Sequence, residues 1–414
     1  MSEADVQPDG EFIRVTGLTG MNPGAGRPSS SVVTERFLLP ARAGTTQPLL
    51  TVDLGAVANN VHTVRSRTTA AVMAVVKANG LGHGAAEVAS TALRSGATWL
   101  GVAGLDEAFA LRRAGFSVPI LSWLNAPRVD LAGAAAASIH VAVPHRAMLD
   151  EVGGIGRGID VHLHVDTGMT RCGASLEEWA DLCAAAREAE LAGRIRVVGV
   201  MSHLGRADEP DAVDNAVSEA RFRESVAVAH RAGLRPAVRH LATTAATLTN
   251  PSVHFDLVRI GAGLVGIDPS GSTRLSGAMT LTAPLIHVRP VTAGTPVGYR
   301  HTWTAPADTT LGLLPLGYAD GLPRAASNRA EVLVDGRRCP VVGLISMDQT
   351  IIDLGDVTAE AGATVTVFGP GDHGEPTVAE WAGWASTIEH EIVTRIGQRV
   401  QRQVVDNDWK EELA

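Results

Sequence analysis

Between residues 50 and 260, short apolar segments alternate with longer stretches that have helical periodicity. The apolar segments lie at residues 49–52, 71–76, 99–102, 120–123, 139–143, 161–165, 197–201, 237–241 and 255–260. Short apolar runs bounded by turn residues are typical of buried strands in parallel sheets. About eight strand–helix units in about 220 residues predict an α/β fold with a (β/α)8 TIM-like barrel.

A doubly wound open sheet is the alternative architecture for such an alternation. That fold carries a Gly-x-Gly-x-x-Gly turn after its first strand, where the backbone approaches a dinucleotide. The turn after the first predicted strand of this chain has no such pattern. The sequence therefore favours the barrel.

The pattern changes after Gly266, where helical periodicity stops. Short β-like segments bounded by Gly and Pro follow at residues 284–291, 310–316, 331–333, 340–345, 350–354 and 364–368, with one late helix at 378–386. Such segments predict a mostly-β C-terminal domain. We expect a barrel domain at residues 47–280 and a β-domain at 281–414. Residues 1–46 lack periodicity and predict a flexible N-terminal extension.

Composition excludes several classes of function. The 414-residue chain has a formal net charge of -9, which does not favour binding to nucleic acid or to an anionic membrane. No apolar run reaches the roughly 18 residues that a membrane span needs. The three cysteines lack metal-site spacing and suit a reducing compartment. We therefore expect a cytoplasmic protein with no metal site, no nucleic-acid partner and no membrane anchor.

A lysine ends the second apolar segment. Residues 71–76 lead directly to Lys77, which is followed by a glycine-rich turn and a predicted helix at 85–95. In barrels, chemistry collects at the carboxyl ends of the strands. Apolar walls there lower the pKa of a lysine and make it a usable nucleophile or base. The alternative is a strand-end lysine that simply reaches solvent.

Polar residues also follow the other predicted strands, and they would point into the same mouth of the barrel. They are Arg171, His203, Thr244 and Arg259. Arg259 could instead be a structural ion-pair partner, and His203 a histidine satisfied inside the barrel.

A phosphate site is predicted beside the lysine. Gly261 and Gly263 expose backbone N–H groups in one turn, and Thr244 begins a predicted helix. Late barrel loops with a helix start commonly bind phosphate. A phosphate next to Lys77 suggests pyridoxal 5′-phosphate, because lysine forms a Schiff base with that cofactor.

The chain has only two tyrosines, and both lie in the predicted β-domain. Tyr299 stands in GYRHTW and Tyr318 in LGYADG, while Met347 and Asp348 belong to a further polar turn. A phenol needs activation by its neighbours to act as a base. Spacing alone does not assign a catalytic role to either tyrosine.

Taken together, these motifs resemble the PLP-dependent alanine racemases of fold-type III. The resemblance runs from about Leu49 to Val404, and it is carried by VVKANGLGHG, VDTGMTRCG, MSHLGRADEP, HLATTAATL, FDLVRIGAGLVG, PVGYRHTW, LPLGYADGLPRAASN and RCPVVGLISMDQ. Several long motifs in one order make the resemblance specific, and it leaves only the N-terminal extension unexplained.

The resemblance implies roles for individual residues. Lys77 matches the Schiff-base lysine and one of two catalytic bases. Tyr299 matches the other base, which the partner subunit of a homodimer supplies on the opposite face of the substrate. His203 matches the histidine that supports this tyrosine, and Arg259 the arginine that faces the pyridine nitrogen. An arginine cannot readily protonate that nitrogen, because its own pKa is so high.

Further matches concern the cofactor and the substrate. Thr244, Gly261 and Ala262 match phosphate-contact positions, and Arg171 matches an arginine hydrogen-bonded to the cofactor's phenolic oxygen at the substrate side. The rim of the substrate pocket is matched by Tyr318, Met347 and Asp348. The resemblance thus implies a small amino-acid substrate and a racemase that interconverts L-alanine and D-alanine for D-alanine biosynthesis.

The chain departs from the family pattern near the cofactor. Leu81 and His390 stand where tyrosines are common, and His164 stands where a lysine is common. Arg300 replaces a glycine directly after Tyr299, and Gln398 replaces a tyrosine of some members. These departures motivate a second hypothesis, a fold-type III enzyme acting on another amino acid as a pathway-specific racemase or decarboxylase. A non-catalytic PLP-binding protein is a third.

Overall fold

The structure is a computed structural model that describes residues 47–156 and 158–406. The predicted N-terminal extension lies outside the described residues. Within these ranges, no helix combines the length and apolar character that a membrane crossing requires.

A closed parallel sheet forms the first part of the described chain. Its strands are β2 (Ala71–Val75), β3 (Trp99–Val102), β4 (Ile120–Ser122), β5 (Ile139–Val143), β6 (Ile159–His164), β7 (Ile195–Met201), β8 (Val238–His240) and β9 (Leu257–Ile260), in the order β8-β7-β6-β5-β4-β3-β2-β9. The two end strands also meet, because the N–H of Arg259 donates to Ala242 O at 3.0 Å and that of Asp256 to Arg239 O at 3.1 Å. The predicted barrel is confirmed, and the open sheet is wrong.

Helices precede and connect the barrel strands. They are α1 (Leu54–Arg65), α3 (Ala85–Arg94), α4 (Leu105–Arg113), α5 (Leu131–Ala136), α6 (Arg146–Gly153), α7 (Trp179–Leu191), α8 (Val213–Arg231) and α9 (Thr244–Thr249). Each longer helix buries one face. On α7 and α8, for example, Trp179 and Phe222 are almost fully buried. Burial of such faces is the main stabilising contribution to a fold of this kind.

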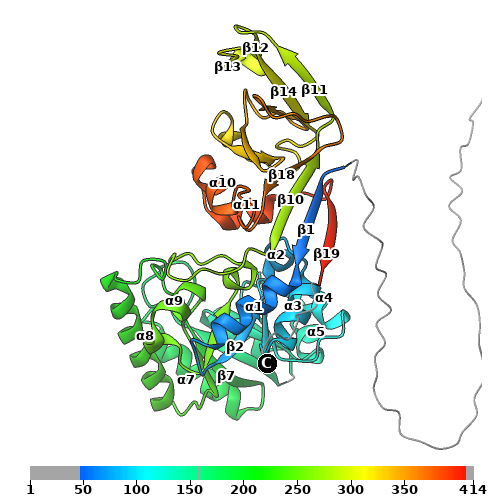
Figure 1. Ribbon diagram of the computed structural model, residues 1–414. Coiled ribbons are helices and arrows are strands. Elements are labelled where there is room, and N and C mark those ends of the chain that lie inside the picture. The colour runs from blue at the N-terminus through cyan, green and yellow to red at the C-terminus, as the bar shows by residue number, and fades with distance from the viewer. Residues whose placement is uncertain (1–46, 157, 407–414) are drawn as a thin grey trace, which may run out of the picture. The chain divides into compact units, whose positions relative to one another are not determined.

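The first predicted strand does not belong to the barrel. β1 (Leu49–Asp53) pairs antiparallel with β10 (Met279–Pro284) and parallel with β19 (Gln401–Val405), as Figure 1 shows. Its residues alternate between half-buried and buried, whereas residues 72–75 of β2 are buried without a break. Alternation is typical of a sheet covered on one face, and a continuous apolar run is typical of a barrel strand. This difference places β1 in the second sheet.

The C-terminal part is mostly β, as predicted. A six-stranded sheet runs in the order β16-β15-β18-β10-β1-β19, and a three-stranded sheet in the order β11-β14-β17. The further strands are β11 (His287–Val291), β12 (Pro296–Val297), β13 (Trp303–Thr304), β14 (Thr309–Leu314), β15 (Glu331–Val334), β16 (Arg337–Pro340), β17 (Thr350–Asp353) and β18 (Thr364–Phe368). A strand was predicted at 340–345, but β16 ends at Pro340. Gly343 has a φ of +74°, which no extended strand allows.

Two helices close the described chain. α10 (Val378–Ala385) was predicted, and its first turn is capped by the Thr377 side chain, which accepts from Glu380 N at 3.2 Å. α11 (Glu389–Arg395) was not predicted, because it is short and follows a residue without a capping side chain. α11 lies against the turn after Lys77: a Cβ at Gly82 would fall 2.4 Å from Val393 O. The second domain thus supplies one wall of the barrel mouth.

Candidate active site

The turn after β2 presents Lys77 in an unusual backbone conformation. In α2 (Lys77–Leu81), the φ angles of Ala78, Asn79 and Gly80 are +53°, +54° and +63°. A left-handed turn costs non-glycine residues about 1–2 kcal/mol each, so surrounding contacts must hold it. The N–H of Ala78 donates to Glu107 Oε1 at 2.7 Å, and that of Gly80 to Val76 O at 2.8 Å. These bonds fix the direction in which the lysine leaves the backbone.

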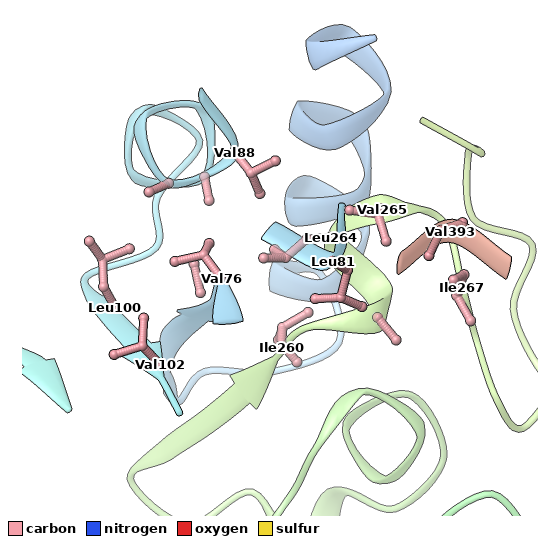
Figure 2. Packing of buried hydrophobic residues seen from close by; sticks show 14 of the residues in the cluster. Val76, Leu81, Val88, Leu100, Val102, Ile260, Leu264, Val265, Ile267 and Val393 are labelled. Atoms are coloured by element: carbon pink, nitrogen blue, oxygen red, sulfur yellow. The ribbon is translucent and has the colours of Figure 1, made fainter. Parts of the chain in front are cut away.

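Leu81 anchors the other end of this turn. Its side chain is 5 % exposed and lies among Val76, Leu264, Val265 and Val393 (Figure 2). Burying a leucine contributes about 1.5–3 kcal/mol. Leu81 is therefore an apolar anchor for the lysine turn, at a position where the resemblance led us to expect a tyrosine.

A cavity of about 500 Å³ opens where the barrel strands end, and Lys77 lies in its wall. The other predicted site residues that line it are Arg171, His203, Thr244, Arg259, Gly261 and Ala262. They come from turns that are far apart in the sequence, and the closed barrel brings their strand ends together. The structure therefore assembles the barrel half of the predicted site.

The surroundings of Lys77 favour a neutral amine. Partial burial lowers the pKa of Lys77, and the positive charge of Arg171 lowers it further, whereas the carboxylate of Glu107 raises it. The Nζ atom lies 5.9 Å from the ring centroid of Trp123, which forms part of the cavity wall. A lysine with a lowered pKa can act as a nucleophile or a base near neutral pH.

Arg259 is held rigidly at the base of this cavity. Its Nη2 donates to Ser202 O at 2.7 Å and to Leu241 O at 3.0 Å, and its Nη1 donates to His240 O at 2.8 Å. The side chain is only 5 % exposed, and burial lowers its pKa to about 10, with a further contribution from Arg171. The guanidinium stays charged at neutral pH and can only donate hydrogen bonds.

His203 contacts this arginine. Its Nδ1 lies 3.4 Å from Arg259 Nη2. Burial lowers the pKa of His203 to about 3, and the positive charges of Arg259 and Arg171 act in the same direction. The imidazole is therefore neutral at pH 7, and because Arg259 can only donate, its Nδ1 is the acceptor.

In the predicted phosphate turn, the backbone of Gly263 lies close to the side chain of Thr244. Gly263 N donates to Thr244 Oγ1 at 3.1 Å, which joins the start of α9 to the short 3-10 helix η2 (Ala262–Val265). A Cβ at Gly263 would fall 2.8 Å from Thr244 Cγ2, so this position has no space for a side chain. The hydroxyl of Thr244 is fixed beside the backbone of this turn.

The predicted residues of the β-domain do not line this cavity. Tyr299 is 69 % exposed, Tyr318 40 % and Met347 56 %. The turns that carry Tyr318, Met347 and Asp348 are joined, because Tyr318 N donates to Ser346 O at 3.0 Å and Ala319 N donates to Met347 O at 2.8 Å.

The turn of Tyr299 belongs to the same surface. Asn328 Nδ2 donates to Thr302 Oγ1 at 3.1 Å, and Asn328 Oδ1 accepts from Gly343 N at 2.6 Å. Asn328 thus links the turn after Tyr299, in η3 (Tyr299–His301), to the loop that leads to Met347. These residues form one exposed patch, separate from the Lys77 cavity within a single chain.

Sequence reasoning missed two residues of the lysine environment. Glu107 accepts from Ala103 N at 2.9 Å as well as from Ala78 N, so it couples α4 to the lysine turn. The only signal for Glu107 was an acidic residue in the first turn of a predicted helix, which usually means capping. Trp123 ends a predicted strand, and an aromatic residue there is most often core.

The charges and the unpartnered nitrogen atoms of the cavity indicate which kind of ligand fits there. Arg171 and Arg259 bring positive charge beside Lys77: both lower the pKa of Lys77, and Arg171 also lowers the pKa of Arg259. His164 Nδ1 and His390 Nδ1 lie in the same wall, are buried, and have no hydrogen-bond partner within the described residues. An anionic ligand with several acceptor oxygens would relieve both conditions.

The comparison with family models agrees with this geometry. Residues 52–269 match the alanine racemase N-terminal domain, and residues 278–404 match the alanine racemase C-terminal domain. The chain belongs to the alanine racemase family. The resemblance read from the motifs is thereby confirmed.

Individual members of the alanine racemase family are similar over nearly their whole length. The alanine racemase of Frankia casuarinae is 47% identical over 365 residues, which are 86% of this chain and 95% of the relative. The structure of alanine racemase from Streptomyces coelicolor is 46% identical with a TM-score of 0.85, covering 87% of this chain and 98% of that one. The Bartonella henselae enzyme, solved with covalently bound pyridoxal phosphate, is 27% identical with a TM-score of 0.79, covering 87% and 100%.

Proposed function

We propose that this chain is an alanine racemase that uses pyridoxal 5′-phosphate to interconvert L-alanine and D-alanine. The observation that carries the proposal is the cavity in which Lys77, with its lowered pKa, lies beside the charged Arg171 and Arg259. Similarity to enzymes named alanine racemase over most of both chains supports it. The cofactor assignment is supported by the relative with covalently bound pyridoxal phosphate.

Residues of the cavity would hold the cofactor by matched chemistry. Lys77 would bind its aldehyde carbon, and Arg259 would donate to its ring nitrogen. Arg171 would donate to its phenolic oxygen, and its phosphate would be held by the hydroxyl of Thr244 with the backbone N–H groups of Gly261 and Ala262. When bound, the cofactor withdraws electrons from the substrate and makes the hydrogen on its Cα acidic.

Two residues of the protein would move the proton. The amine of Lys77 would take or return the Cα proton on one face, and the lowered pKa that its surroundings produce favours this role. The phenol of Tyr299 serves the opposite face. Arg259 keeps its proton throughout, because the pKa of its guanidinium stays far above neutral.

Tyr299 requires a second copy of the chain. It is exposed and lies outside the Lys77 cavity, together with Tyr318, Met347 and Asp348. We place this patch over the cavity of a partner subunit in a homodimer, where Tyr299 is the second base and the other three form the rim of the substrate pocket. His203 lies in the cavity wall and its imidazole is neutral, which is consistent with a role in supporting the tyrosine of the partner subunit.

D-Alanine biosynthesis and a cytoplasmic location both stay predictions from the sequence. The proposed activity is tested with purified protein and pyridoxal 5′-phosphate in deuterated water. L-Alanine should exchange its Cα hydrogen for deuterium and yield D-alanine, and Lys77→Ala should abolish both. If a panel of amino acids includes one that exchanges faster than alanine, the substrate assignment is wrong. Absence of exchange with every amino acid would refute the racemase.

A further inference from the structure

A row of three histidines runs through the barrel from Arg259 toward the opposite end. Arg259 Nη1 lies 3.1 Å from His240 Nδ1, and His240 Nε2 lies 2.8 Å from His162 Nδ1. His162 Nε2 lies 3.2 Å from His140 Nδ1, and His140 Nε2 lies 3.4 Å from Asp160 Oδ2. Residues separated by more than a hundred positions thus form one continuous chain of polar contacts.

The direction of every hydrogen bond in this row follows from Arg259. A guanidinium can only donate, so His240 Nδ1 must accept, and the proton of His240 sits on Nε2. His162 then accepts at Nδ1 and donates from Nε2 in its turn. His140 likewise accepts at Nδ1 and carries its proton on Nε2, which points at the carboxylate of Asp160.

Burial keeps these histidines neutral, so these tautomers hold at neutral pH. His162 and His240 are completely buried, and burial lowers their pKa values well below the usual range. Burial also lowers the pKa of His140 to about 4, although Asp160 acts in the opposite direction. A neutral imidazole has one donor and one acceptor, and this row uses both on each ring.

The barrel is built to admit this row. His162 on β6 and His240 on β8 are separated by β7, and the register shift between Val161 and His162 pairs His162 with Gly199 of β7. A Cβ at Gly199 would fall 2.2 Å from His162 Nδ1. Trp99 packs edge-on against the rings of His140 and His162, with centroid distances of 5.1 and 5.7 Å. A bulge, a glycine and an aromatic wall therefore hold the histidines in line.

The far end of the row is anchored near the surface. Asp160 is the second residue of β6, and Arg196 holds its carboxylate through Nε at 2.6 Å and Nη2 at 2.5 Å. The partners of Arg259 within the described chain are carbonyl oxygens and imidazole nitrogens rather than a carboxylate. The three histidines therefore connect Arg259 to the carboxylate of Asp160 through successive polar contacts.

We infer that Asp160 is a positioning residue for Arg259, acting as the terminal acceptor that, together with the donor Arg259 at the other end, fixes the tautomers of His140, His162 and His240. The inference rests on the proposed function, in which Arg259 faces the ring nitrogen of the cofactor. Without an acceptor at position 160, His140 can move its proton to Nδ1. The Nδ1–H of His140 would then face the Nε2–H of His162, so His162 and afterwards His240 would also have to move their protons to Nδ1. The Nδ1–H of His240 would finally face an N–H of Arg259, which is also a donor.

Two variants distinguish the role of Asp160 as a hydrogen-bond acceptor from its ion pair with Arg196. Asp160→Leu removes the acceptor, whereas Asp160→Asn keeps an acceptor oxygen of the same shape, and both lose the charge pair with Arg196. We expect Asp160→Leu to lower kcat about tenfold, with little change in KM, and to shift the absorbance of the bound cofactor. Outer partners of site residues in metalloproteins have effects of this size. Asp160→Asn should stay within about twofold of the parent protein.

Arg196→Leu is the matched control, since it removes the ion pair and leaves the acceptor; it should behave as the parent protein. Equal losses in Asp160→Leu and Asp160→Asn would overturn the inference, as would a parent-like spectrum and kcat in Asp160→Leu. If Asp160→Leu does not fold, the inference is tested on the parent protein by nitrogen NMR with isotope-labelled histidine. The spectra should show a protonated Nε2 and an unprotonated Nδ1 at His162 and His240. The opposite pattern would refute the row even if the racemase activity is present.

Discussion

Gly199 lies directly across the β6–β7 ladder from His162, and a Cβ at Gly199 would fall 2.2 Å from the ring nitrogen Nδ1. The glycine is required here by space and not by backbone conformation, because a buried imidazole occupies the position that a side chain would take. Gly199 thereby leaves space inside the barrel for the row of three histidines.

Gly199→Ala should destabilise the protein. The added methyl group must displace the His162 ring in a closely packed interior, and overpacking of this kind costs about 1–3 kcal/mol. Urea unfolding at pH 7.5 measures the loss in free energy of unfolding. Gly383→Ala is the control, because Gly383 lies in α10 with nothing within 4 Å of a Cβ. A Gly199→Ala protein as stable as the parent would contradict the packing described for His162.

Leu81→Ala should lower the free energy of unfolding by about 2–5 kcal/mol, the usual cost of truncating a fully buried leucine. Its side chain is 5 % exposed and anchors the left-handed turn that carries Lys77. Leu191→Ala is the matched control, because Leu191 is 70 % exposed at the end of α7 and should change stability by less than about 0.5 kcal/mol. Equal effects of the two substitutions would show that Leu81 is not an anchor.

Acid should destabilise the protein well above the pH at which its carboxylates protonate. Burial lowers the pKa values of His83, His140 and His164 to about 4 and that of His203 to about 3. The unfolded chain takes up protons at these histidines near pH 6.5, whereas the folded chain does not. Stability is therefore complete above about pH 6.5 and falls toward pH 4, by up to about 1.4 kcal/mol per pH unit for each histidine.

Urea unfolding between pH 7.5 and 4.5 measures this slope. His83→Gln should reduce the slope by one proton. A free energy of unfolding that stays constant between pH 6.5 and 5 would show that these histidines are not held neutral.

Glu107→Gln should lower the pKa of Lys77 further. The carboxylate raises that pKa, while burial and the neighbouring arginines lower it, and glutamine removes the charge but keeps an acceptor for Ala78 N. The rate at which cofactor-free protein binds pyridoxal 5′-phosphate depends on the neutral amine. Its pH midpoint, followed by absorbance, should therefore move to lower pH. The exposed Glu87 supplies the control variant Glu87→Gln, and a midpoint that moves upward in Glu107→Gln would contradict the assignment.

Local patterns could predict the barrel and its cavity, because strand ends of a closed parallel sheet must meet. Apolar runs identified β2 to β9; Lys77 comes shortly after one of these strands and Arg259 lies near the end of another. Pairing partners far along the chain could not be predicted, which is why β1 was expected in the barrel although it joins β10 and β19.

The polar row could not be predicted for the same reason. His140, His162 and His240 are separated by 22 and 78 positions, and only the barrel closure brings them within hydrogen-bond distance. A single histidine on an apolar strand indicates nothing about its partners. Tyr299 does not line the cavity within one chain, so its proposed role as the second base requires a second copy.

The central claim is that each active site combines Lys77 of one subunit with Tyr299 of the other, and mixed dimers test it directly. Lys77→Ala and Tyr299→Phe should each be inactive as pure proteins. When they are unfolded together and refolded as a mixture, about half of the dimers should be mixed, and each mixed dimer has one site with both bases intact. The account predicts recovery of about a quarter of the parent racemase activity. A mixture that stays as inactive as the separate variants would contradict it.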